Sequence, residues 1–149
     1  GQLSLLLVVF GLASFTGNLV GGQVSDRIGY QRSMLIGGAA QTVILLAIYI
    51  GSAFQWASII LIVLLNVSAW FTGLQLNTGI AQVTQNKSSF LISINSSAIQ
   101  LGGAIGSSLA AVVITVSGIE HIVLVALLFT SLTIVIQWVA IKKGEKNVK

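Results

Sequence analysis

Residues 17–32 read GNLVGGQVSDRIGYQR and join two long stretches of the chain that carry no charge. Residues 1–25 contain no Asp, Glu, Lys or Arg, and residues 33–86 contain none either. The charges between them are Asp26, Arg27 and Arg32. A helix needs about 20 mostly apolar residues to cross a bilayer. The quoted segment is therefore predicted to turn the chain between two membrane spans.

The rest of the chain repeats the pattern. Residues 88–119 and 122–141 are also free of Asp, Glu, Lys and Arg. Of the 149 residues, 55% are hydrophobic and 7% are charged, whereas ordinary soluble domains carry roughly 25% charged residues. This composition excludes a cytosolic enzyme, a nucleic-acid-binding module and a disordered tail. It predicts an all-α polytopic membrane protein with five transmembrane helices, at about 3–24, 33–51, 57–80, 89–116 and 121–141, followed by a polar tail at 142–149.

The basic residues predict the orientation of these spans. If successive helices alternate in direction, all seven Lys and Arg residues fall on one side: Arg27, Arg32, Lys87, Lys142, Lys143, Lys146 and Lys149. Glu120 lies on the other side. This is the positive-inside pattern. It predicts a multi-pass protein of the cell membrane whose C-terminus and Asp26 turn are cytoplasmic, and whose basic tail meets anionic lipid rather than nucleic acid.

The turn has a recognisable spacing, Gly22-x-x-x-Asp26-Arg27-x-Gly29, with Arg32 just beyond. It resembles the cytoplasmic loop signature of the major facilitator superfamily of secondary transporters. The resemblance implies that the loop latches two halves of a transporter together on the cytoplasmic side. Tyr30 occupies a position that is often basic in that family, as does Gln31. The alternative interpretation is a loop that only caps two helices.

The resemblance extends to the order of the spans. Five spans that end inside, with this motif after the first, match helices eight to twelve of a twelve-helix transporter. Residues 93–108, SINSSAIQLGGAIGSS, look like the eleventh helix of the drug and sugar efflux branch. The resemblance implies efflux of a small solute by alternating access, driven by a proton gradient without a bound cofactor. The partner would be the missing N-terminal half of the transporter, since a chain that begins with Gly suggests part of a longer polypeptide.

Polar and small residues inside the spans supply further candidates. Asn66, Trp70 and Asn77 recur at helical spacing on the third predicted span, and Asn95 and Gln100 lie on the fourth. They could line a substrate cavity or bond across helices. The candidates for close helix packing are glycines: Gly17, Gly21, Gly102, Gly103 and Gly106.

Ionisable groups are absent from the depth of the predicted spans, which favours a neutral or lipophilic solute. The chain has no Cys and one His, and no residues in the spans could form a catalytic group or hold a metal. We therefore predict that it is not an enzyme. Two hypotheses stay open: the C-terminal part of an efflux transporter, and a non-transporting membrane module that binds a partner subunit.

Overall fold

The computed structural model describes residues 2–51, 55–85 and 89–147. All five predicted helices are present, each long and apolar enough to cross a membrane, and no strand occurs in these described ranges. The fold class is therefore confirmed, and the helices begin or end within a few residues of the predicted spans, except at the C-terminus. Their bounds are α1 Gln2–Ile28, α2 Tyr30–Gly51, α3 Gln55–Val83, α4 Ser89–Ser117 and α5 Glu120–Asn147.

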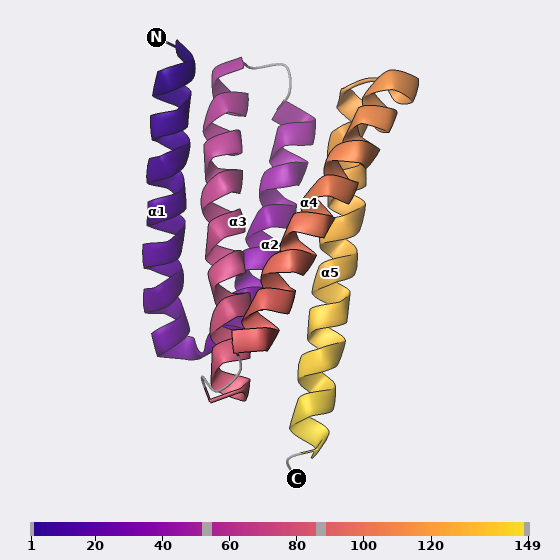
Figure 1. Ribbon diagram of the computed structural model, residues 1–149. Helices are drawn as coiled ribbons and strands as arrows, with labels where there is room; N and C mark the ends of the chain where they lie inside the picture. The colour runs from indigo at the N-terminus through magenta and orange to yellow at the C-terminus, as the bar shows by residue number, and fades with distance from the viewer. Residues whose placement is uncertain (1, 52–54, 86–88, 148–149) are drawn as a thin grey trace.

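The helices run alternately up and down (Figure 1). The N-terminus, the end of α2 and the start of α5 lie at one end of the molecule, and the α1–α2 turn and the C-terminus lie at the other. Arg27, Arg32 and Lys142 therefore share one end, and Glu120 lies at the opposite end. The last helix continues through most of the polar tail. There the ammonium of Lys142 lies 4.7 Å from the ring centroid of Trp138, a cation–π distance.

The packing centres on α3, which lies against both α1 and α2, while α2 also packs on α5. Small residues allow this closeness. A side chain at Gly37 of α2 would collide with Phe71 and Thr72 of α3, and one at Gly38 would meet Ile134 of α5. Helices in lipid associate through such close contacts, because burying apolar surface gives no advantage there.

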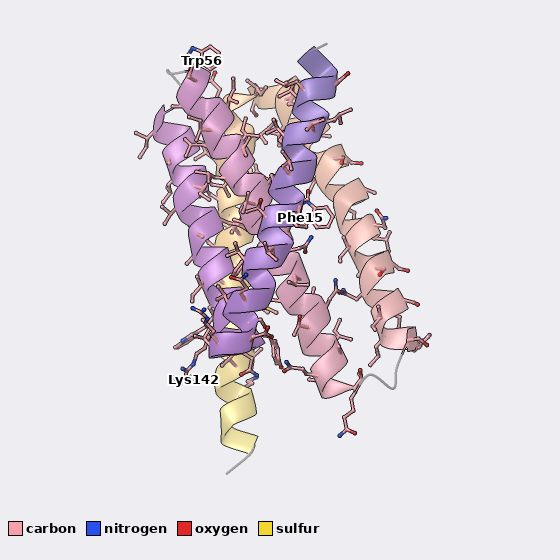
Figure 2. The ribbon with its side chains drawn as sticks, turned by 90° about the vertical axis from the view of Figure 1, so that its left-hand side faces the viewer. Phe15, Trp56 and Lys142 are labelled. Atoms are coloured by element: carbon pink, nitrogen blue, oxygen red, sulfur yellow. The ribbon has the colours of Figure 1, made fainter. Side chains whose placement is uncertain are left out.

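Helix α4 differs from the other four. It makes the fewest contacts with other helices, touching α5 and, more sparsely, α3; none of its residues is buried, which is also true of the described residues of α5. Figure 2 shows Phe15 of α1 pointing toward the side on which α4 stands, and the ring is largely exposed. The core of this chain is thus the group α1, α2, α3 and α5, with α4 beside it.

Candidate functional site

The turn between α1 and α2 is built on backbone hydrogen bonds to one glycine. Gly29 adopts a φ of 84°, as expected for a helix end that favours glycine. Its N–H donates to the Ser25 carbonyl at 2.9 Å, which closes α1. Its own carbonyl accepts the N–H of Ser33 at 3.1 Å and the Ser33 hydroxyl at 2.9 Å, which opens α2. Only one residue separates the two helices, so the turn is short and rigid.

The charged residues of the turn lie at the surface of the described chain. Asp26, Arg27 and Arg32 are all exposed. Among the residues that the structure describes, none of the three has an ion-pair or hydrogen-bond partner of its own side chain. The turn thus presents an unpaired carboxylate and two guanidinium groups at one end of the helices. Such groups can bind another charged segment, a helix terminus or a lipid headgroup.

Tyr30 follows Gly29 and has a structural role. Its ring lies on Gly79 of α3, where an added Cβ would approach the ring to 2.6 Å. This contact explains why an aromatic residue stands at a position that the motif often gives to a basic one. The neighbouring Gln31 is exposed, and its amide lies 3.4 Å from the Tyr30 hydroxyl.

The glycines before the turn contact α3. A Cβ at Gly17 would collide with the Val67 carbonyl and lie 3.0 Å from the Cβ of Trp70. At Gly21 it would lie 3.2 Å from the amide nitrogen of Gln75. Gly22 has more room, since its nearest neighbour, a methyl of Leu74, would be 3.9 Å away. Gly17 and Gly21 therefore allow α1 and α3 to approach closely.

The polar candidates on α3 face different helices. The Asn66 side-chain oxygen lies 3.4 Å from the Ser14 hydroxyl of α1, a long hydrogen bond, and Asn66 is half-buried. Trp70 is about half exposed, at 49%. Asn77, near the other end of α3, accepts a hydrogen bond of 2.9 Å from the side-chain amide of Asn95 on α4. The structure thus brings two of the candidates together, Asn77 and Asn95.

A cavity of about 440 Å³ lies between α2, α3 and α4, and Asn95 of this pair lines it. Its walls are almost wholly apolar, and Asn95, Thr84 and Tyr30 are the polar residues among those that line it. Cavities of this size and character hold small organic molecules in proteins. The lining has no Asp, Glu, Lys or Arg, so the cavity suits an uncharged molecule.

The remaining candidates on α4 touch nothing close. Gln100 is exposed. No atom of the described residues would lie within 4 Å of a Cβ added at Gly102, Gly103 or Gly106. The structure does not bring these four residues to the Asn77–Asn95 pair or to the turn. Nor do the described residues include a group of His, Cys, Asp or Glu that could hold a metal ion.

Sequence reasoning missed two glutamines that tie the helices together. Gln75 of α3 is fully buried, and its amide donates to the Gly21 carbonyl of α1 at 2.9 Å. Gln41 of α2 donates to the Ser68 carbonyl of α3 at 3.1 Å and to the Thr72 hydroxyl at 3.2 Å. The role of Gln41 could have been predicted, because Ser33, Gly37 and Gln41 follow one another at steps of four and therefore lie on one face of the helix.

Comparison with known proteins agrees with the motif. The profile of the Major Facilitator Superfamily matches residues 1–149. YbcL of Bacillus subtilis (strain 168), an uncharacterised MFS-type transporter, is 27% identical over 110 residues. That match covers 74% of this chain but 28% of the relative, so the chain spans well under two thirds of the relative's length. No solved structure matches at a significant level. Because the profile covers the whole chain, the chain belongs to the Major Facilitator Superfamily.

Proposed function

We propose that the chain forms helices eight to twelve of a secondary transporter that exports a small solute by alternating access. One observation carries this proposal: the Asp26 turn is exposed and unpaired at the end of the bundle that gathers the basic residues. The positive-inside rule assigns that end to the cytoplasm. The C-terminus is then cytoplasmic, the membrane is the cell membrane, and Asp26 is free to contact the other half of the transporter.

The proposed partner is an N-terminal half, as yet unseen, that closes against this one. Exposed residues of α4, including Gln100 and its three glycines, offer a surface for the missing helices. The turn would latch the two halves while the transporter faces outward. Rocking of one half against the other around a central site is how transporters of this architecture work. The proton gradient would supply the energy, through a titrating residue outside this chain.

The proposed solute is neutral or lipophilic. The cavity beside Asn77 and Asn95 has apolar walls and no ionisable lining residue other than Tyr30. Asn95 lines the cavity, and its amide oxygen, which is not used in the bond to Asn77, can accept a hydrogen bond. A largely apolar molecule with one hydroxyl or amide group fits this combination.

Neutralising the carboxylate of the turn tests the proposal. We expect Asp26→Asn in the full-length protein to slow export of the neutral dye Nile red from cells by at least tenfold, with unchanged amounts of protein in the membrane. The isosteric amide keeps the shape and removes the charge that binds the opposite half. Glu120→Gln is the matched control, because it neutralises an exposed carboxylate at the other end of the helices.

Two results would count against the proposal. Equal export by Asp26→Asn and the unchanged protein would remove the turn from the mechanism. If no export of Nile red or of labelled uridine were measurable, while the protein co-purified with another membrane subunit, the chain would be a non-transporting module.

A further inference from the structure

The Gly21 carbonyl on α1 serves two helices at once. Within α1 it accepts the N–H of Ser25, as helix geometry requires. From α3, the amide of Gln75 donates to the same oxygen at 2.9 Å. Gln75 is fully buried, and it reaches the carbonyl because Gly21 has no side chain in its way. A fully buried amide between two membrane helices is costly unless its hydrogen bonds are made.

Ser25 differs in its bonding from three other hydroxyls of α1 and α2, and within the described residues the buried Ser68 hydroxyl of α3 also lacks a partner. Ser14, Thr16 and Ser33 each donate to the carbonyl four residues earlier, at 2.7 to 2.9 Å. For Ser25 that carbonyl belongs to Gly21 and is occupied by Gln75. Within the described part of the chain, the buried Ser25 hydroxyl has no partner, and neither does the side-chain oxygen of Gln75. Two donors therefore compete for one acceptor.

We propose that transport involves an exchange at the Gly21 carbonyl, with Gln75 and Ser25 as the positioning residues. In the arrangement seen here, Gln75 donates and holds α3 to α1. In the second arrangement, the Ser25 hydroxyl donates to the same carbonyl, Gln75 is released, and α3 moves relative to α1. Each arrangement makes one of the two bonds and leaves the other donor unpaired, so a solute that favours one arrangement can shift their populations.

The exchange links the turn to the polar residues of α3. Ser25 directly precedes Asp26, and Gln75 lies on the same helix as Asn66 and Asn77, two residues before the latter. A change at the solute site can thus alter the turn through one hydrogen bond. The part of this inference that concerns transport rests on the proposed function, whereas the exchange itself is a property of α1 and α3.

The absence of cysteine makes a direct test possible. A methyl of Leu74 lies 3.2 Å from the Cβ position of Gly21, so α1 shields a thiol introduced by Leu74→Cys until the two helices separate. The experiment measures its rate of reaction with N-ethylmaleimide in membrane vesicles, in the full-length protein without other cysteines. We expect Gln75→Leu to raise the rate about threefold and Ser25→Ala to lower it about threefold, the shift that one average interhelical bond in a membrane supports.

Two controls separate exchange from general loosening. Thr16→Ala removes an exposed hydroxyl of α1 that bonds the Leu12 carbonyl, and Gln41→Leu removes a glutamine that joins α2 to α3. Both should leave the rate at position 74 unchanged. If Gln75→Leu fails to insert, the shorter Gln75→Asn should raise the rate in its place.

The decisive result is that Gln75→Leu and Ser25→Ala change the labelling rate at position 74 in opposite directions. A static packing role predicts that Ser25→Ala leaves the labelling rate unchanged or raises it as Gln75→Leu does, and either result would overturn the exchange. The labelling needs no solute. If the two variants shift the labelling rate in opposite directions but Nile red is not exported, the exchange stands and the proposed transport is rejected. If Nile red is exported but the labelling rate does not shift in opposite directions, the proposed transport stands and the exchange is rejected.

Discussion

Helices α1 and α4 both carry glycines and hydroxyl residues at helical spacing, but their surroundings differ. In α1, Gly17 and Gly21 lie so close to α3 that an added methyl would meet its backbone or the Gln75 amide. In α4, the three glycines Gly102, Gly103 and Gly106 have no described atom near their Cβ positions. The two helices are similar in sequence character, and only one of them is covered.

This contrast teaches what small-residue spacing means in a membrane helix. The spacing shows that a helix can approach another closely, because small side chains let backbones come together. The spacing of small residues does not show which helix is the neighbour. It also does not show whether that neighbour lies within these 149 residues. For α4, we expect the partner to come from the proposed missing segments of the transporter.

The largest expected difference in stability is between two variants that each add one methyl group, Gly17→Ala on α1 and Gly103→Ala on α4. Gly17→Ala places a Cβ against the Val67 carbonyl and the Phe71 N–H, backbone atoms that cannot rotate away. We expect it to lower the free energy of unfolding by about 1–3 kcal/mol, as overpacking commonly does. Gly103→Ala should cost nothing measurable. Unfolding in detergent titrations, followed by circular dichroism, gives both values.

The same pair of variants can break the comparison. If Gly103→Ala destabilises the full-length protein as strongly as Gly17→Ala does, the glycine face of α4 is covered in the intact molecule. If neither variant changes the free energy of unfolding, α1 and α3 can move apart enough to accept a methyl group at Gly17. The contrast between α1 and α4 would then disappear.

The fold could be predicted from sequence because the charges mark the ends of the helices. Asp26, Arg27 and Arg32 fall at the first turn, and Glu120 opens α5. The cost of charge in a bilayer makes such residues reliable markers. The helical extension of α5 beyond residue 141 was not predicted, since polar sequence outside the membrane can continue a helix that has already started.

The site was harder to predict, because residues on one helical face need not share a neighbour. Asn66 and Asn77 share one face of α3, and their spacing left open whether they line a cavity or bond across helices; in the structure Asn66 bonds to α1 and Asn77 bonds to α4. They lie about three turns apart on α3, so different helices can be their neighbours. Gln75 lies off the face that Asn66 and Asn77 share, and nothing in its spacing indicated that it would bond the Gly21 carbonyl.

A second, smaller difference in stability is expected between variants of two glutamines, Gln41 on α2 and Gln100 on α4. Gln41→Leu removes two hydrogen bonds between α2 and α3, and we expect a loss of about 1 kcal/mol in unfolding free energy, from about 0.6 kcal/mol for each bond. Gln100→Leu should leave stability unchanged, because Gln100 is exposed and bonds nothing in the described chain. The same detergent titration measures both. A loss at Gln100 equal to that at Gln41 would mean that α4 has a polar partner elsewhere.

The smallest expected effect concerns the one side-chain hydrogen bond between α3 and α4 in the described ranges. Asn77→Ala and Asn95→Ala, singly and together, form a double-mutant cycle across the 2.9 Å bond. We expect a coupling energy of about 0.6 kcal/mol, the average for such bonds in membranes. Because α4 has few other contacts with α3, this bond carries much of what holds the two together at the cavity. A coupling of zero would mean that this bond does not hold α4 against α3, and that Asn77 does not fix Asn95 in the wall of the cavity.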